Sequence, residues 1–451
     1  MLAGGLSDMI TPAEAGSGSF LRGVVNKLSG AEKYPGAVST RFPDAARRTE
    51  DPLATYLQPN MAALRADPKN YEKVLRIMAD YPGMPAGLSA SADLPAVEQQ
   101  ISDFMKGNLR SIYQAQPDVA RGLGSKWYEG ANRIAREKAG EFDLSTPSTA
   151  AVYAALSPQK DWFMNVSLGD RVLDIMANQQ RKVADSEMLK TGRNLVNAKG
   201  VRILEDADLN ALKGRQLRSL SPEDQATFVR LFDETYNPRG YDVIGPTGER
   251  LGPKLTKEGA PGGVAWGTFD QIENAIKAIR SGGDVNQISS DILGGRHKVR
   301  SFYNNILYPN ATLGDVTSDT HNVAASLFRP LSGNSPEVTH NLASGGAKGA
   351  INMPSSAITG VQGSYPMFVD PMQQVAAEFG VLPRSAQSVT WEGIRGLFPP
   401  EFKRSSQADQ IEQIWREQGI KNADEARRQI VNLRGGYRPP EWVPFYQEAP
   451  R

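Results

Sequence analysis

Apolar residues recur every three to four positions along most of this chain, which is the pattern of amphipathic helices. Tyr71, Val74, Leu75 and Met78 share one such face, and their segment begins at an aspartate followed by proline, a common helix start. The pattern predicts a mainly α-helical protein. Helices are expected at 67–80, 94–114, 118–139, 150–156, 160–179, 188–236, 269–281, 370–379, 388–398, 409–418 and 423–433.

Two stretches interrupt the helical pattern. Glycine and proline are frequent within 236–266, where the runs 241–244 and 249–251 flank a Gly-Pro-Thr-Gly turn. This arrangement predicts a small β-hairpin, inserted into a helical body. Gly, Ser, Asn and Pro dominate 332–362, and a segment of this length and composition is expected to be a long loop.

The expected organisation has three parts. Residues 1–60 are rich in Gly, Ser, Ala and Pro and are expected to form a flexible N-terminal arm. Residues 61–335 are expected to form the helical core, with the insertion at about 236–266. Residues 336–451 would add a loop and a C-terminal helical extension. A chain of 451 residues has room for two or three units, because single cores stop growing near roughly 250–300 residues.

Composition excludes several kinds of chemistry. The absence of cysteine excludes disulfides, zinc–thiolate sites, iron–sulfur clusters and thiol catalysis. The three histidines match no zinc spacing and no P-loop is present, so neither a metal nor a nucleotide cofactor is expected. Lys and Arg number 51 against 50 Asp and Glu, so nucleic-acid binding would require a local basic patch. No export signal and no long apolar run is recognisable, which predicts a protein that does not enter a membrane.

The segment 291–327 carries the clearest candidate chemistry. A Gly-Gly-Arg-His turn lies between two short helical patterns, which predicts a helix-hairpin-helix. Its glycines would let backbone N–H groups at the start of the second helix approach a DNA phosphate, and the helix dipole favours the anion. Three cations and no acid lie between Gly294 and Asn310. The residues expected to contact DNA here are Gly294, Gly295, Arg296, His297 and Arg300.

Two blocks resemble the helix-hairpin-helix DNA glycosylases of the endonuclease III and 8-oxoguanine glycosylase kind. Leu293-Gly294-Gly295, then Lys298-Val299, then Val316-Thr317-Ser318-Asp319-Thr320-His321 is similar to their hairpin, catalytic lysine and catalytic aspartate. Ala155-Leu156-Ser157-Pro158-Gln159 is similar to a segment that opens an early helix and carries a residue that enters the DNA. The matching blocks cover roughly 145–180 and 285–330.

The resemblance implies a helix-hairpin-helix core and base excision from double-stranded DNA. Lys298 would attack the sugar carbon that loses its base and form a Schiff base, as in abasic-site lyases. Asp319 would stabilise the positive charge that develops on the sugar. Gln159 and Lys160, which follow the helix break at Ser157-Pro158, would contact DNA.

A non-catalytic interpretation stays open. In it, Lys298 and Arg300 are solvated residues on a helix face, and Asp319 only caps the helix that follows. The segments 156–162 and 387–392 also resemble uncharacterised bacteriophage proteins. The alternative function is therefore a phage virion-internal or structural protein that keeps the fold without catalysis, with other virion proteins as partners. Its location would be the bacterial host cytoplasm or the virion.

Overall fold

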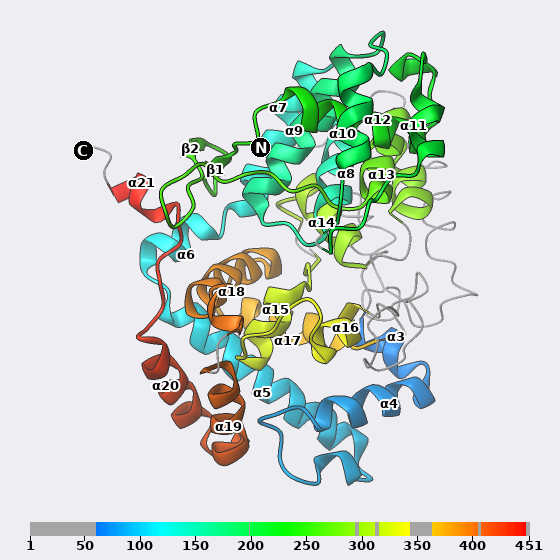
Figure 1. The fold of residues 1–451 in the computed structure, drawn as a ribbon. Helices are drawn as coiled ribbons and strands as arrows, with labels where there is room; N and C mark the ends of the chain where they lie inside the picture. Colours follow the sequence, from blue (N-terminus) through cyan, green and yellow to red (C-terminus); the bar gives the residue numbers. More distant parts are fainter. Residues whose placement is uncertain are drawn as a thin grey trace, which may run out of the picture. The chain divides into compact units, whose positions relative to one another are not determined.

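Helices form most of the described part of the chain, as the hydrophobic pattern predicts (Figure 1). Within that part, the β-strands belong to a single two-stranded sheet, and no helix has the length and apolar character that a membrane crossing requires. The flexible arm expected at 1–60 lies, except for Asn60, outside the described residues. The computed structural model describes residues 60–197, 199–293, 297–311, 315–342, 363–404 and 407–447.

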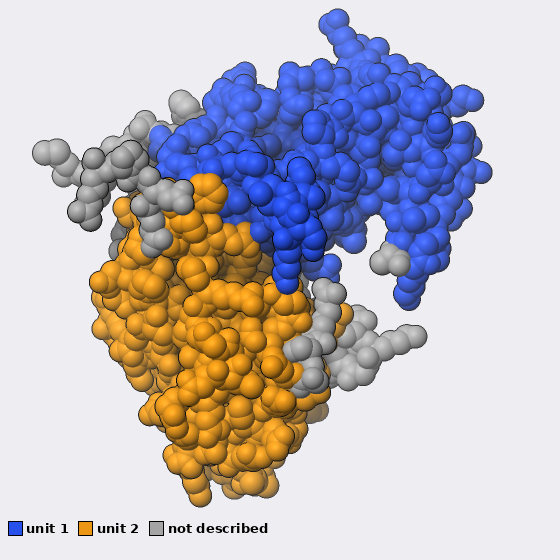
Figure 2. Space-filling model, turned by 60° about the vertical axis from the view of Figure 1, so that its left-hand side comes forward, with its two compact units in different colours: residues 1–15, 133–293 blue, residues 16–132, 294–451 orange. Residues whose placement is uncertain are grey.

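The chain forms two compact units, which Figure 2 distinguishes by colour. Of the described residues, 133–293 form unit 1, whereas 60–132 and 297–447 together form unit 2. The described part of the chain therefore begins in unit 2, crosses to unit 1 and returns. This division differs from the expected continuous core at 61–335, because helices from both ends of the chain share one hydrophobic core.

Unit 1 is built around helix α8 (Thr146–Leu156), whose residues from Pro147 onward are all buried. The Ser145 side chain caps the helix by accepting the backbone N–H of Ser148. Helix α8 packs on α13 and α9. The other elements of unit 1 are α9 (Trp162–Asn178), α10 (Ser186–Asn194), α11 (Asp206–Leu212), the 3-10 turn η4 (Leu217–Ser219), α12 (Pro222–Tyr236), α13 (Phe269–Arg280) and the π-helical turn η5 (Gln287–Ile292).

The expected hairpin is present in unit 1, where β1 (Asp242–Ile244) pairs antiparallel with β2 (Arg250–Pro253). The helix expected over 188–236 is wrong in its middle, because residues 195–205 are not helical. There the Asn197 side chain accepts the backbone N–H groups of Lys199 and Val201, and Gly200 has a φ of 74°. Such side-chain hydrogen bonds compete with helix formation and favour a turn.

Unit 2 is organised on the long helix α5 (Leu94–Ala115), which contacts α4, α15, α17 and α18. Helix α7 (Trp127–Glu141) leaves unit 2 after Asn132 and continues into unit 1. The remaining elements of unit 2 are α3 (Met61–Arg65), α4 (Pro68–Ala79), η3 (Leu88–Ala90), α6 (Asp118–Gly124), α14 (His297–Leu307), α15 (Thr320–Leu327), α16 (Pro336–Leu342), α17 (Tyr365–Glu378), α18 (Pro383–Leu397), η6 (Phe402–Arg404), α19 (Gln407–Gln418), η7 (Ile420–Asn422), α20 (Ala423–Arg434) and α21 (Val443–Gln447).

The C-terminal helices are part of the core of unit 2 rather than an extension of it. Phe104 of α5 meets Trp415 of α19 edge-on, with ring centroids 5.0 Å apart, and Tyr113 stacks on Phe379 at 4.4 Å. The long loop expected at 332–362 also contains a helix, α16, which has proline in its first turn and a following glutamate that suits the helix dipole. Residues 343–362 lie outside the described part.

Candidate functional site

The segment 315–318, just before α15, is buried and held by side chains from several helices of unit 2. Both amide atoms of Gln387 bond to the Thr317 backbone, which donates to Oε1 at 3.3 Å and accepts from Nε2 at 3.1 Å. The Tyr365 hydroxyl bridges the Val316 carbonyl and the Ser318 N–H at 2.9 and 3.1 Å. We call this set of side chains the polar cradle. It consists of Tyr128, Ser301, Asn304, Asn305, Asn341, Tyr365 and Gln387.

The polar cradle holds the segment 315–318, and this segment leads directly into Asp319. Its Oδ1 atom accepts the backbone N–H groups of His321 and Asn322 at 2.9 and 3.0 Å, so Asp319 is the N-cap of α15. Burial alone raises the pKa of this carboxyl, but the hydrogen bond from His321, the charges of His321 and Lys298 and the N-cap bond from Asn322 lower the pKa to about 2. The carboxylate is therefore ionised at neutral pH, and 22% of its side chain remains exposed.

Lys298 lies in the first turn of α14, where its amine is 5.5 Å from the centre of the Phe302 ring. That ring contacts Tyr128 of the polar cradle edge-on, with centroids 6.0 Å apart. Burial lowers the pKa of the Lys298 amine, and the negative charge of Asp319 partly opposes this lowering. The structure thus brings together the two residues expected to be catalytic, an amine with reduced basicity and an ionised carboxylate.

Four further side chains lie around Asp319, although none of them was expected to belong to the site: His321, Trp391, Arg395 and Lys403. The His321 ring meets Trp391 edge-on at 5.4 Å, and the Arg395 guanidinium lies over the same tryptophan at 4.4 Å. Burial and the Arg395 charge lower the pKa of Lys403 to about 8, against the opposing effect of Asp319. The spacing of Trp391 and Arg395 on one helix is a recognisable signal for a cation–aromatic pair. Lys403 has no such signal, because only the tertiary fold brings it here.

Two of the expected DNA-contacting residues are buried. Arg300 has no exposed surface, and its guanidinium lies 2.9 Å from Nδ1 of His297, which is 4% exposed. A phosphate cannot reach a guanidinium in this position, so the surface role expected for Arg300 and His297 does not fit this structure. The reason is that both faces of α14 are covered in unit 2. The other hairpin residues, Gly294, Gly295 and Arg296, lie outside the described residues.

Gln159 and Lys160 belong to unit 1, in the turn between α8 and α9. Helix α9 begins after the N-cap Asp161, so both residues precede it rather than start it. Gln159 is exposed and has a φ of 60°, a left-handed conformation that costs free energy for any residue with a Cβ atom. Lys160 is half-buried, and burial lowers the pKa of its amine. The turn therefore presents the Gln159 side chain to solvent at the expense of backbone strain.

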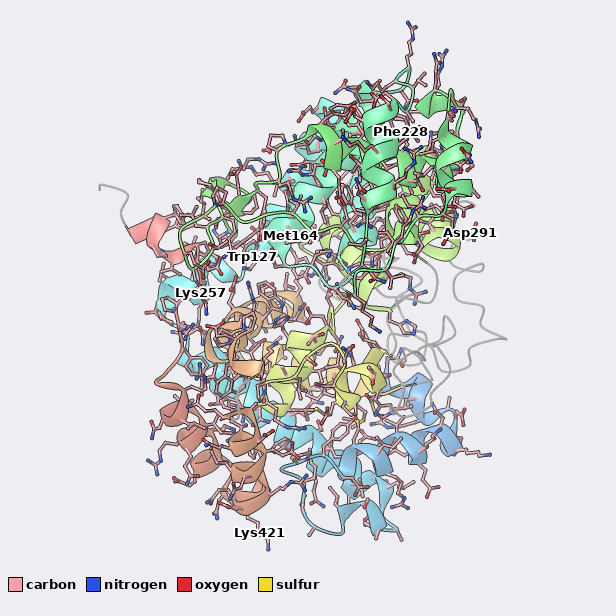
Figure 3. The ribbon with its side chains drawn as sticks, viewed as in Figure 1. Trp127, Met164, Phe228, Lys257, Asp291 and Lys421 are labelled. Carbon is pink, nitrogen blue, oxygen red and sulfur yellow. The ribbon has the colours of Figure 1, made fainter. Side chains whose placement is uncertain are left out.

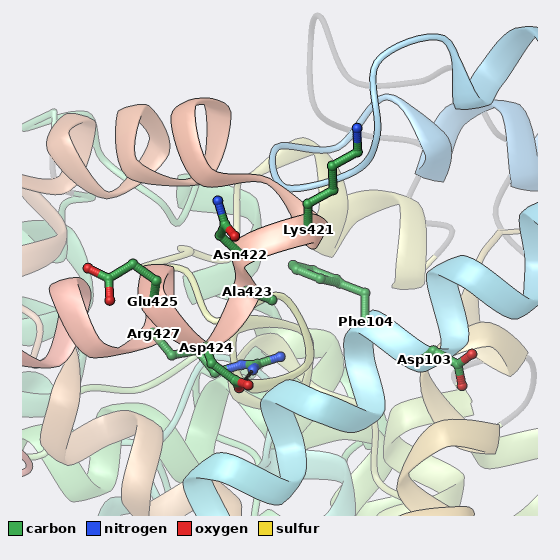
Figure 4. A pocket seen from close by; sticks show the side chains of 8 residues that line it. All are labelled: Asp103, Phe104, Lys421, Asn422, Ala423, Asp424, Glu425 and Arg427. Carbon is green, nitrogen blue, oxygen red and sulfur yellow. Dashed lines mark hydrogen bonds and ion pairs between the residues drawn. The ribbon is translucent and has the colours of Figure 1, made fainter.

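A pocket of about 610 Å³ lies elsewhere in unit 2, between α5 and the start of α20 (Figure 4). Its charges are largely paired within the protein, since Arg427 bonds to Asp424 at 2.5 Å and Asp103 to Lys106 at 2.7 Å. Such a lining offers little to a charged ligand. The described residues also contain no group of His, Asp and Glu side chains that could hold a metal ion. The cluster around Lys298 and Asp319 is therefore the stronger candidate.

The comparisons leave the function open. Residues 94–214 match the model of a family of unknown function, DUF7178. This match runs from α5 of unit 2 through α11 of unit 1 and does not include Lys298 or Asp319. No curated protein and no solved structure matches the chain.

Proposed function

We propose that this protein is a helix-hairpin-helix DNA glycosylase with abasic-site lyase chemistry, acting on double-stranded DNA. The observation that carries the proposal is that the buried Lys298 amine lies within electrostatic reach of the ionised Asp319 carboxylate in unit 2. A lysine can attack carbon only as the free amine, and burial of Lys298 increases the population of that form at neutral pH. Asp319 supplies a fixed negative charge where the sugar becomes positive.

The proposed reaction begins with attack of the Lys298 amine on C1′ of the damaged nucleotide. An N–C1′ bond forms as the bond to the base breaks, and the base leaves with a proton taken from solvent. One amine proton passes to O4′ as the sugar ring opens, which gives a protonated Schiff base. Removal of a C2′ proton then breaks the C3′–O bond and nicks the strand. Asp319 stabilises the cationic sugar in the first step, and the polar cradle keeps its carboxylate in place.

The turn carrying Gln159 supports the DNA part of the proposal. An exposed polar side chain held on a left-handed backbone is a costly arrangement, and such strain concentrates at functional positions. Gln159 also belongs to the segment that, in the resembling family, carries a residue that enters the DNA. Its exposure is compatible with that role.

The decisive experiment is borohydride trapping on duplexes that contain an abasic site, uracil, an oxidised purine or an alkylated base. Wild-type protein should become covalently linked to at least one of them, and Lys298→Ala should not. Lys421→Ala is the matched control. Lys421, labelled in Figure 3, is an exposed lysine of η7 in unit 2 and does not belong to the cluster around Lys298 and Asp319. No adduct on any substrate would reject the catalytic proposal and favour the non-catalytic virion alternative.

A further inference from the structure

Lys403 lies within electrostatic reach of Asp319, and the single helical turn that carries it, η6, is firmly packed. The neighbouring Phe402 is buried and stacks on Phe398 at the end of α18, with ring centroids 5.8 Å apart. The Arg434 guanidinium covers the same Phe402 ring at 3.7 Å and donates to the Leu397 carbonyl at 2.9 Å. These contacts fix the backbone from which the half-buried Lys403 side chain extends.

The charges around Lys403 do not balance within the protein. Arg395 is engaged by the Trp391 ring and lies 3.8 Å from Glu392, a buried carboxyl that also accepts hydrogen bonds from Trp127 and Trp442. By contrast, no hydrogen bond or ion pair joins Lys403 to another residue within the described ranges. The nearby Asp319 carboxylate is already bonded to two backbone N–H groups. The single Asp319 charge therefore acts on two lysines, Lys298 and Lys403, and an anionic ligand would balance the second positive charge.

We propose that Lys403, with Arg395 beside it, binds a phosphodiester of the DNA strand next to the sugar that Lys298 attacks. This inference rests on the proposed function, because it takes the reacting sugar to lie between Lys298 and Asp319. Every internal deoxyribose in DNA carries a phosphate on each side, so a sugar in that position brings a phosphate into the same cluster. A lysine ammonium binds phosphate as a compact point charge, and partial burial strengthens the attraction.

The role assigned to Lys403 is positioning. Holding the flanking phosphate would set the distance between C1′ and the Lys298 amine without Lys403 touching the bond that breaks. Trp391, half-buried between His321 and Arg395, would form the wall of this phosphate site.

The test uses a duplex with a tetrahydrofuran abasic analogue, which cannot form a Schiff base, so that binding is measured apart from chemistry. Fluorescence anisotropy across a salt series gives the affinity and its log–log slope for the full chain. Lys403→Gln should weaken binding by about ten- to hundredfold, the factor expected for one hydrogen bond to a charged group. Its salt slope should become shallower by about 0.9, the value for one lost phosphate contact.

Two matched variants separate a phosphate contact from a general loss of charge. Lys403→Arg keeps the cation and should retain most of the wild-type slope, whereas Lys421→Gln removes an exposed cation of η7 that is not part of the proposed site and should leave the slope unchanged. An unchanged slope in Lys403→Gln would overturn the inference, and so would a borohydride adduct on Lys403 itself. If the wild type binds the analogue with the expected Lys403 dependence but never forms an adduct, the proposed catalysis fails and the phosphate site stands.

Discussion

The Asp319 carboxylate and the Lys298 amine lie close enough for each charge to change the pKa of the other. They come from different helices, the N-cap of α15 and the first turn of α14. The two shifts have different origins. Burial dominates the lowered pKa of Lys298, whereas the hydrogen bonds and charges around Asp319 overcome the effect of burial on that carboxyl. A change at Asp319 should therefore alter both the rate of the proposed reaction and its pH dependence.

The first prediction concerns Asp319→Asn. The Lys298 amine reacts in its neutral form, so the rate of adduct formation should rise as the pH increases through the lowered pKa of Lys298. The Asp319 charge holds that pKa up, so its removal should move the rise to lower pH. The plateau rate should also fall by roughly 10²–10³-fold, as expected for losing one electrostatic stabiliser. Single-turnover trapping from pH 5 to 9 measures both effects. A slower plateau with an unmoved profile would contradict the coupling.

The second prediction separates the backbone of Gln159 from its side chain. Gln159→Gly should leave the free energy of unfolding unchanged or raise it by up to about 1 kcal/mol, because glycine adopts a positive φ without strain. The same variant should bind an abasic-analogue duplex more weakly, since it lacks the side chain. Asp143→Gly is the matched control, because Asp143 is also exposed in unit 1 and has a φ of 53°. If both variants bind DNA like the wild type, Gln159 is not a DNA contact.

The third prediction concerns the packing that supports this turn. A Cβ atom at Gly169 in α9 would overlap the ring of Tyr153 in α8. That ring cannot move aside freely, because its hydroxyl donates to Asp170 at 2.8 Å. Gly169→Ala should therefore lower the free energy of unfolding by about 1–3 kcal/mol in urea denaturation. Gly140→Ala, in an open helical position, should instead raise it by about 0.5–1 kcal/mol. Equal effects at the two sites would argue against close packing of α8 on α9.

The fourth prediction concerns His340, a buried residue of α16 whose Nδ1 lies 2.9 Å from the Tyr81 hydroxyl. Burial and the charge of Lys73 lower its pKa from 6.5 to about 4. As the pH falls, the unfolded chain therefore binds a proton before the folded protein does. The stability that the folded protein has while His340 is neutral is present above pH 6.5 and is lost as the pH falls toward 4. Between pH 7 and pH 5, the free energy of unfolding of the wild-type protein should fall by about 2 kcal/mol more than that of His340→Gln. Equal losses in the two proteins would contradict a lowered pKa for His340 in the folded state.

Local patterns predicted most helices and their starts, because those signals lie within a few residues of one another. Asp67 and Ser221 cap helices through their own side chains, and each stands directly before a helical pattern. The hairpin was predictable for the same reason. The helix at 336–342 was missed because its segment is rich in residues typical of loops.

The candidate site was predictable only in part. Lys298 and Asp319 could be named because they lie within one short segment and follow a family resemblance. Arg300 was expected at the surface because it is one of three cations in a segment without acids, yet both sides of its helix are covered in unit 2. Lys403 and Gln387 could not be found, since their contacts depend on how the C-terminal helices pack against residues far earlier in the chain. Long-range packing of this kind leaves no local signature.

The polar cradle has a consequence for the order in which the site can form during synthesis. Tyr365 and Gln387 reach the segment 315–318 from α17 and α18, which leave the ribosome after the residues they hold. A nascent or truncated chain that stops before α17 would contain both Lys298 and Asp319 but not the side chains that fix Asp319. It would also leave α5 without two of its main packing partners. The proposed activity would therefore appear late in synthesis, only once the C-terminal helices have folded back onto α5.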